Sequence, residues 1–212
     1  MDTCIIFCAG GFRELRRAPD SSDYLLAADG GLVHLQKLGL TPHGIIGDFD
    51  SLGYVPVNAQ VFPVEKDDTD SMLAVRKGLE LGYRNFEVYG ALDGPRLDHT
   101  VANLQTLAFL AEHGARGHMI GLSYMATALG PGVHRFPAGA TGTVSLFCLG
   151  PDATGVTLEG LHYPLEDGTL TAHFPLGVSN HFTHQPARVT IGSGTLIALY
   201  DVENGFVTGE CL

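Results

Sequence analysis

Charge is scarce in this sequence of 212 residues: only 17% of the residues are charged, whereas 45% are hydrophobic. This balance excludes a disordered chain and indicates a buried core, for which the length allows one large domain or two small ones. Basic residues are the scarcest class, 12 against 23 acidic ones, for a formal net charge of −11. Because nucleic acid and anionic membranes are bound through Lys and Arg, we expect neither as a general partner. A nucleotide stays compatible with this charge, since a divalent metal can bridge carboxylates to phosphate.

Cysteine is also rare, and its spacing excludes two common kinds of site. The four cysteines, Cys4, Cys8, Cys148 and Cys211, form no C-x-x-C pair, so neither a zinc nor a redox motif is predicted. His173, His181 and His184 fit no compact zinc pattern either. No apolar run reaches membrane-spanning length, and the first one is too short for a signal peptide. We therefore expect a cytoplasmic protein.

Two nucleotide-binding motifs are missing as well. The sequence contains no G-x-x-x-x-G-K-[ST], which argues against a P-loop, and no G-x-G-x-x-G after its first apolar run. Any phosphate site must therefore be built in another way.

The first half of the chain alternates short apolar runs with helical patterns. Strands are expected at 3–9, 23–28, 44–47, 59–64, 85–90 and 117–122, and helices after Gly31, over 69–82 and over 97–114. In the helix over 69–82, Thr69 or Asp70 is the expected cap, with Leu73 and Leu79 as its apolar spacing. This alternation predicts an α/β domain with a largely parallel sheet.

The second half has a different pattern. From about Ser123 onward, short alternating runs such as 143–149, 187–191 and 195–202 are separated by Gly, Pro, Asp and Asn, and no helix is predicted. This pattern is typical of an all-β sandwich or open barrel. The fold class predicted is therefore an α/β N-terminal domain over 1–122, followed by an all-β, sandwich-like domain over 123–212.

Carboxylates gather in the loops that follow the predicted strands. The stretch GDFDS places Asp48 and Asp50 after one strand, and KDDTD places Asp67, Asp68 and Asp70 after the next. Ligands of open α/β sheets bind at the carboxyl ends of the strands, where such loops meet. Like charges brought together repel unless a cation lies between them, and Mg²⁺ prefers oxygen ligands. The sequence therefore predicts a shared metal site at this edge.

In their order and spacing, the motifs ADGG, GDFDS, KDDTD, RLDHTVAN and LGVSN resemble those of the thiamine pyrophosphokinases (thiamine diphosphokinases). The resemblance extends along nearly the whole chain and implies transfer of a pyrophosphoryl group from ATP to thiamine, with release of AMP. It also implies Mg²⁺ as cofactor, ATP as co-substrate and a homodimer with thiamine bound at the subunit interface.

The resemblance assigns roles to individual residues. It implies Asp48, Asp50 and Asp70 as metal ligands, with Asp67 close by. Catalytic roles fall to Asp98, Arg96 and Asp67, and binding roles to Asp29, Gly30, Lys66, Ser179 and Asn180. The sequence departs from the family pattern at Pro95, which precedes the arginine, and at His181, where the family often has Glu after S-N.

Two other functions are compatible with the acidic loops. The stretch IIGDFDSLG imitates the D-x-D loop of haloacid dehalogenase-type phosphatases, in which the first Asp becomes phosphorylated. That loop follows the third predicted strand here rather than the first, and no late acidic pair follows. The second alternative is a non-catalytic nucleotide-binding domain whose loops only hold metal.

Overall fold

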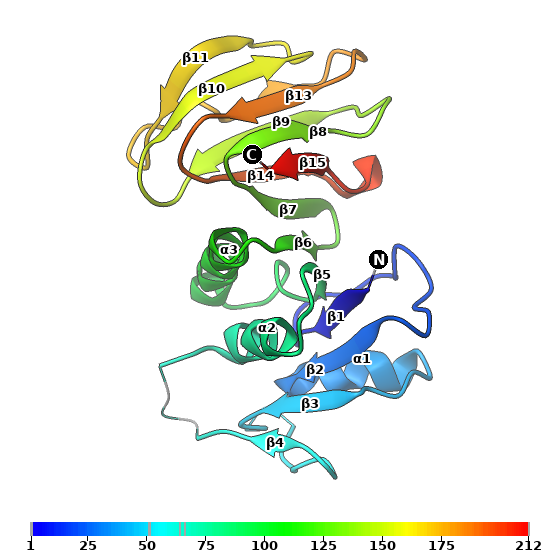
Figure 1. Cartoon of the computed structure of the whole chain (residues 1–212). Helices are drawn as coiled ribbons and strands as arrows, with labels where there is room; N and C mark the ends of the chain where they lie inside the picture. The colour runs from blue at the N-terminus through cyan, green and yellow to red at the C-terminus, as the bar shows by residue number, and fades with distance from the viewer. Residues whose placement is uncertain (1, 51, 64, 66, 212) are drawn as a thin grey trace. The chain divides into compact units, whose positions relative to one another are not determined.

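The computed structural model describes residues 2–50, 52–63, 65 and 67–211. The chain divides into two compact units, one comprising Met1–Thr106 with Gly114–Leu122 and the other Leu107–His113 with Ser123–Leu212. Each unit is described by itself below, with the elements as labelled in Figure 1.

Six strands build the sheet of the first unit. They are β1 (Thr3–Phe7), β2 (Tyr24–Ala28), β3 (Gly44–Gly47), β4 (Gln60–Val61), β5 (Asn85–Tyr89) and β6 (Arg116–Ile120). Their order is β6-β5-β1-β2-β3-β4, and each of the five neighbouring pairs is parallel. All five residues of the central strand β1 are buried, as expected for a strand covered on both faces. This arrangement brings the carboxyl ends of the strands to one edge.

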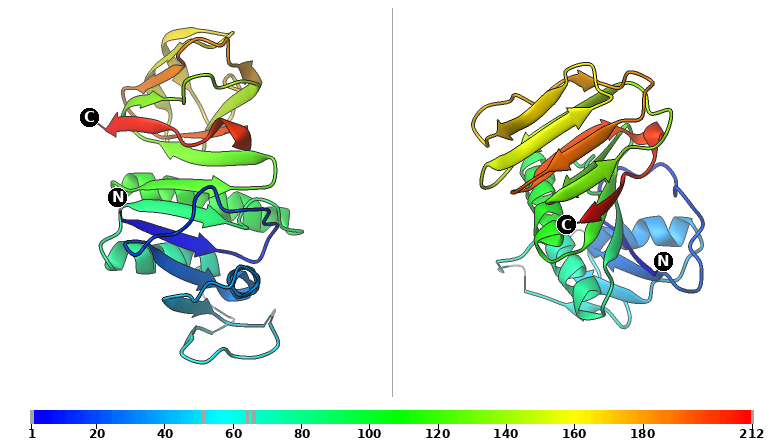
Figure 2. Two further views of the ribbon diagram at one scale, coloured as in Figure 1. Left: turned by 90° about the vertical axis from the view of Figure 1, so that its right-hand side faces the viewer. Right: turned by 45° about the horizontal axis from the view of Figure 1, so that its top comes forward.

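The helices of the first unit connect these strands. They are the 3-10 helix η1 (Asp29–Gly31), α1 (Leu32–Lys37), α2 (Asp70–Glu80) and α3 (Leu97–Glu112), the last of which begins in this unit. Figures 1 and 2 show α1 and α2 on opposite faces of the sheet. The first turns of α2 and α3 line the same edge as the acidic loops.

Helix α2 packs through small side chains rather than leucines. Thr69 caps it, its hydroxyl accepting a hydrogen bond from the Met72 backbone N–H at 3.2 Å. The buried positions are Ser71, Ala74, Val75 and Gly78, whereas the expected Leu73 and Leu79 are only half-buried. A Cβ on Gly78 would lie 2.5 Å from the Phe86 ring, so the helix approaches the sheet more closely than leucines would allow.

The second unit is rich in β structure. Its strands are β7 (Tyr124–Leu129), β8 (Gly132–Arg135), β9 (Thr143–Cys148), β10 (Ala153–Glu159), β11 (Leu165–Leu170), β12 (Asn180–His181), β13 (Arg188–Ile191), β14 (Leu196–Asp201) and β15 (Thr208–Cys211), with a 3-10 helix η2 (Val202–Asn204). They pair antiparallel in the orders β12-β9-β14-β7 and β11-β10-β13-β8-β15. Buried positions recur at every second residue of β9, so that strand turns one face to the core.

The strand directions confirm the sheet expectation in part. The six strands of the first unit pair in parallel, and antiparallel pairs follow in the second unit, so the sheet architecture of the chain is mixed. One strand needs correction. The strand expected over 59–64 is reduced to Gln60–Val61. Pro63 has no N–H to give to a neighbouring strand, which ends the pairing, and Val64 lies outside the described residues.

No helix in the described part of the chain has the length and hydrophobicity needed to cross a membrane. Cys4, Cys8 and Cys148 are buried free thiols.

Candidate functional site

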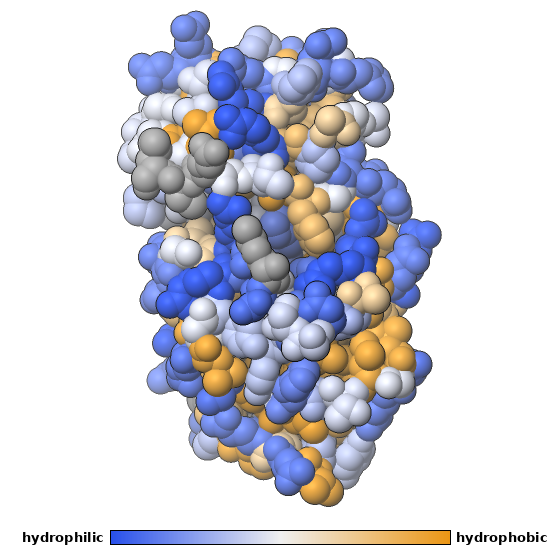
Figure 3. Space-filling view, turned by 45° about the vertical axis from the view of Figure 1, so that its right-hand side comes forward, coloured by the Kyte–Doolittle hydropathy of each residue, from blue (hydrophilic) through white to orange (hydrophobic). Residues whose placement is uncertain are grey.

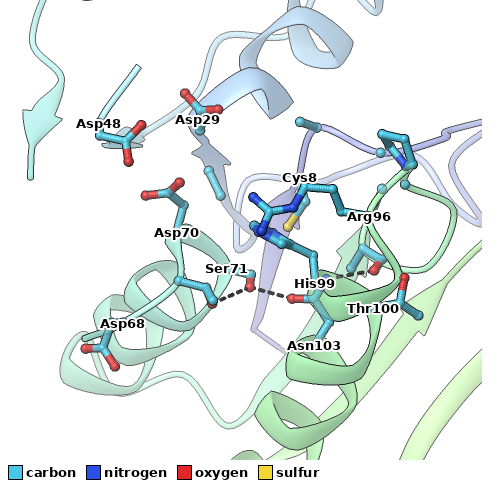
Figure 4. Close-up of a pocket in the computed structure, with 18 of the residues that line it drawn as sticks. Cys8, Asp29, Asp48, Asp68, Asp70, Ser71, Arg96, His99, Thr100 and Asn103 are labelled. Atoms are coloured by element: carbon cyan, nitrogen blue, oxygen red, sulfur yellow. Dashed lines mark hydrogen bonds between the residues drawn. The ribbon is translucent and has the colours of Figure 1, made fainter. Parts of the chain in front are cut away.

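A cavity of about 580 Å³ opens at the carboxyl edge of the parallel strands, within the first unit. Its walls come from the residues that follow β1, β2, β3 and β5 and from the first turns of α2 and α3 (Figure 4). The lining comprises Cys8, Ala9, Gly10, Ala28, Asp29, Asp48, Asp50, Asp68, Thr69, Asp70, Ser71, Gly90, Ala91, Gly94, Pro95, Arg96, His99, Thr100 and Asn103. The predicted ligand edge of the sheet is therefore a real pocket of a size that suits a small molecule.

Three carboxylates meet in this pocket. Asp29, Asp48 and Asp50 each offer an oxygen, and these oxygens lie within 4.8 Å of one another. Asp29 is buried, Asp48 half-buried and Asp50 exposed. Carboxylates this close repel one another, and a shared divalent cation offsets the repulsion.

Asp29 is held in a strained backbone conformation by close packing. Its φ is +47°, a region that residues with a side chain enter at some cost, and its residue is 8% exposed. Gly47 makes room for it, because a Cβ there would lie 3.0 Å from the Asp29 Cα. The ADGG and GDFD loops therefore interlock.

Phe49 sets the direction of the two aspartates beside it. The Phe49 side chain is buried, 3% exposed, although the backbone has a φ of +61°. Burial of the ring fixes the turn, so that Asp48 and Asp50 both face the pocket. The Asp50 N–H donates to the Asp48 Oδ1 at 3.2 Å, which further fixes the loop.

Asp70 reaches the same pocket from the first turn of α2. Figure 4 shows its carboxylate pointing toward Asp48 and Asp29. Of the predicted metal ligands, the structure thus groups Asp48 and Asp50 most tightly, adds Asp29 to them and places Asp70 opposite.

Arg96 and Asp98 form an exposed pair at the start of α3. The Arg96 Nη2 lies 2.6 Å from the Asp98 Oδ2, and both side chains are 65% exposed. The hydrogen bond from Arg96 lowers the pKa of Asp98 below its usual range, and the same pair raises the pKa of Arg96. Arg96 lines the cavity, whereas Asp98 is absent from its walls.

The other predicted residues of the first unit lie at or beyond the margin of the pocket. Asp67 is exposed and outside the lining, while its neighbour Asp68 lines the cavity and pairs with Arg76 at 3.3 Å. Gly30 is half-buried in η1 and does not line the cavity, and Lys66 lies outside the described residues.

Ser179 and Asn180 belong to the second unit. The buried Asn180 amide braces the chain: its oxygen accepts from the Tyr163 and His181 N–H groups at 2.9 Å each, and its Nδ2 donates to the Tyr163 carbonyl at 2.8 Å. Ser179 has a φ of +58°, and its N–H donates to the Ser145 hydroxyl at 3.0 Å.

Several pocket residues escaped the sequence-based prediction. His99, Thr100 and Asn103 line the cavity from α3, three, four and seven residues after Arg96. That spacing is the signature of one helix face, so the helical period could have identified them once Arg96 was chosen. Ser71 and Cys8 gave no such signal. Burial raises the pKa of the Cys8 thiol to about 12, with a smaller contribution from Asp70, so the group stays protonated at neutral pH.

The fold and the pocket together define the class of this protein. A strand-end cavity with clustered carboxylates and an arginine at its rim is typical of an enzyme that acts on phosphate groups with a divalent metal.

Comparison with known proteins narrows the class. Residues 15–116 match the thiamin pyrophosphokinase catalytic domain, and residues 134–196 match the thiamin pyrophosphokinase vitamin B1 binding domain. The chain belongs to the thiamin pyrophosphokinase family, which confirms the resemblance seen in the motifs.

Similar proteins match this chain over nearly its full length. Thiamine pyrophosphokinase of Bacillus subtilis (strain 168) is 27% identical over 206 residues, covering 90% of this chain and 95% of the relative. The crystal structure of thiamine pyrophosphokinase from Bacillus subtilis superposes with a TM-score of 0.82 at 25% identity, covering 95% of this chain and 99% of that one. The structure of thiamin pyrophosphokinase from Geobacillus thermodenitrificans gives a TM-score of 0.77 at 24% identity, covering 94% and 97%, and shows the shared fold.

Proposed function

We propose that this protein transfers a pyrophosphoryl group from ATP to thiamine, giving thiamine diphosphate and AMP. The observation that carries the proposal is the cluster of Asp29, Asp48 and Asp50 in a strand-end pocket of a chain from this family. In the transfer, the thiamine hydroxyl oxygen forms a bond to the β-phosphorus of ATP. The bond from that phosphorus to the oxygen that bridges it to the α-phosphate breaks, AMP leaves with that oxygen, and the hydroxyl proton passes to water.

The donor set of the pocket fits a hard divalent cation. Carboxylate oxygens within 4.8 Å of one another, with no nitrogen or sulfur ligand among them, suit Mg²⁺. Asp48 and Asp50 would hold the ion together with Asp70, the third ligand that the family resemblance implies, and Asp29 is the third carboxylate of the 4.8 Å cluster. When bound, Mg²⁺ neutralises negative charge on phosphate oxygens.

The protein's own side chains supply the remaining charge and orientation. Arg96 would bind a phosphate oxygen from the rim, and Asp98 holds the guanidinium in place. Because its pKa is lowered, Asp98 is a weaker proton acceptor than a lone aspartate, so orienting Arg96 is the role that its geometry favours. Asp67 would act beside the phosphates, as would Lys66, which the family resemblance implies as a binding residue. Gly30 belongs to the ADGG turn that supports Asp29.

We assign catalysis to an α/β domain over residues 1–122 and thiamine binding to a sandwich-like domain over 123–212. The match of residues 134–196 to a vitamin B1 binding domain supports the second assignment. Ser179 and Asn180 would contact thiamine, in the proposed homodimer at the subunit interface. Since the Asn180 amide is already engaged with Tyr163, its main contribution would be to fix the loop that presents Ser179.

Three free thiols among the described residues suit the reducing cytoplasm, where we place the activity.

The test is AMP production from ATP and Mg²⁺, with and without thiamine, followed by chromatography of the product. AMP that forms only with thiamine, together with thiamine diphosphate, is the expected result. AMP without a thiamine product indicates a nucleotide pyrophosphohydrolase, and phosphate without AMP indicates a phosphatase; either result contradicts the proposal. Metal and ATP binding without AMP would leave a binding domain.

Asp70→Asn is the matching variant. Removing one carboxylate charge from the pocket should lower turnover by about two orders of magnitude or more while the protein stays folded. Circular dichroism and a thermal melt check the fold. A variant with undiminished, Mg²⁺-dependent turnover would remove Asp70 from the ligand set.

A further inference from the structure

In the sequence, Asp70 lies between Thr69 and Ser71, and the hydroxyl groups of both residues are hydrogen-bonded. The Thr69 hydroxyl accepts from the Met72 N–H at the start of α2 and contacts the Ser71 hydroxyl at 3.0 Å. Ser71 in turn reaches across to α3, where its Oγ donates to the Asn103 Oδ1 at 2.6 Å (Figure 4). The residues on both sides of Asp70 are therefore connected to a second helix.

Asn103 connects this chain to the sheet. Its Nδ2 donates to the carbonyl of Ala91, just after β5, at 2.7 Å. Both Ser71 and Asn103 are 7% exposed, so water competes little for these bonds. Three separate parts of the pocket wall are thus joined: the turn after β5, the inner face of α3 and the first turn of α2.

The direction of each bond follows from the chemistry of the groups. A backbone carbonyl only accepts, so the nitrogen of the Asn103 amide must face Ala91 and its oxygen must face Ser71. Ser71 spends its only hydroxyl hydrogen on that oxygen. In the contact between the two hydroxyls, Thr69 must then be the donor. The amide orientation therefore fixes every hydroxyl in the chain, and each link supports the next.

We infer that Ser71 and Asn103 are positioning residues for Asp70, fixing the backbone from which its carboxylate enters the metal pocket. The inference rests on the proposed function, because it takes Asp70 to be a metal ligand. Neither side chain is needed to contact the ion. Outer partners of this kind, which hold a ligand in place, typically change metal affinity by about 10- to 100-fold when removed.

The test is the affinity for Mn²⁺ alone, measured by electron paramagnetic resonance of the free ion in a titration without nucleotide. We expect Ser71→Ala and Asn103→Leu each to raise the Mn²⁺ Kd by about tenfold or more. The double variant should be no weaker than the weaker single variant, since both changes break one chain. In an Asp70→Asn background, adding Ser71→Ala should leave the Kd unchanged.

Thr106→Val is the matched control for general damage to α3. Thr106 is also a polar residue buried in this helix, 1% exposed, but its hydroxyl bonds within the helix, to the Ala102 carbonyl at 3.0 Å. The control should lose comparable thermal stability and keep the wild-type Mn²⁺ Kd.

The outcomes separate this inference from the proposed function. An unchanged Kd in Ser71→Ala and Asn103→Leu, with Asp70→Asn weakened, overturns the positioning role alone. An increase in the Mn²⁺ Kd equal to that of Thr106→Val also overturns it, because the effect would then be general destabilisation. If Asp70→Asn binds Mn²⁺ like the wild type, or the wild type does not bind Mn²⁺, the metal assignment of the proposed function fails together with the inference.

Discussion

Arg96 carries a positive charge at the rim of the pocket, and its hydrogen bonds to Asp98 fix the position of the guanidinium. The hydrogen bond from Arg96 keeps the pKa of Asp98 below its ordinary value of about 4, so Asp98 is ionised throughout the neutral range. A carboxylate in that state orients a guanidinium well and accepts a proton poorly. The pH dependence of turnover near neutrality should therefore come from other groups.

Asp98→Asn tests this role. We expect turnover to fall by about tenfold, because Arg96 loses a charged partner. The acid limb of the pH–rate profile should stay where it is, because Asp98 already titrates below it. Arg96→Ala should lower turnover more, on the order of 100-fold, because it removes the charge that we propose to bind phosphate. Steady-state rates between pH 5 and 9 measure both effects. Loss of the acid limb in Asp98→Asn would instead identify Asp98 as the proton acceptor.

At the scale of elements, a buried ion network holds the segment between β1 and β2 against the sheet. Arg17 contacts both oxygens of Asp23, at 2.5 and 2.8 Å, and its Nε lies 2.9 Å from the Glu87 Oε1 on β5. The Tyr89 hydroxyl donates to the other oxygen of Glu87 at 2.8 Å. The Asp23 side chain is fully buried, so its ionised form depends on the ion pair with Arg17.

Asp23→Asn should lower the free energy of unfolding by about 3 kcal/mol at pH 7, because Arg17 would lose one of the two carboxylates that balance its charge. The hydrogen bond from Arg17 lowers the folded-state pKa of Asp23. The stabilisation is therefore present above the unfolded pKa of about 4 and is lost as pH falls through the folded value. Urea unfolding at several pH values should show the difference between variant and wild type shrinking below about pH 4.

Glu80→Gln is the control for this prediction. Glu80 pairs with Lys77 at 3.5 Å on the surface of α2, with its side chain 68% exposed. Its removal should change the free energy of unfolding by less than about 0.5 kcal/mol. A loss in Asp23→Asn as small as that of the control would show that the network does not stabilise the fold.

The same scale shows what periodicity could and could not predict. The strand-end rule placed Asp48, Asp50 and Asp70 in one pocket, because it depends only on the order of parallel strands. It could not predict that α2 packs through Gly78 against Phe86, since hydropathy favours the leucines. Nor could it predict the bond between Ser71 and Asn103, 32 positions apart, because pairing across elements depends on the distance between them.

At the scale of the whole molecule, the resemblance to a family predicted more about function than the pattern of apolar and polar residues did. Alternation predicted two halves of different character and the parallel pairing of the first, but it could not predict the order of the strands, because strand order leaves no periodic signal. The roles predicted for Ser179 and Asn180 rest on the motif alone. The structure adds that the Asn180 amide is engaged with Tyr163, a bond to a backbone group that no sequence spacing indicates.

Large hydrophobic side chains at the surface of the second unit bear on the proposed homodimer. Phe174 is 63% exposed and Leu176 is 51% exposed, in one segment with Val178. Hydrophobic residues also lie among polar ones on the face seen in Figure 3. Neighbouring exposed apolar residues of this kind are typical of protein interfaces.

Phe174→Glu should convert a dimer to a monomer, because a carboxylate in an apolar interface loses its hydration without gaining a partner. Light scattering after gel filtration should give about twice the chain mass of 22.5 kDa for the wild type and about 22.5 kDa for the variant. If thiamine binds between subunits, the variant should also raise the KM for thiamine more than that for ATP. Val57→Glu is the control, since Val57 is 84% exposed in the first unit, and it should change neither mass nor KM. A dimeric Phe174→Glu would place the interface elsewhere, and a monomeric wild type would exclude the shared thiamine site.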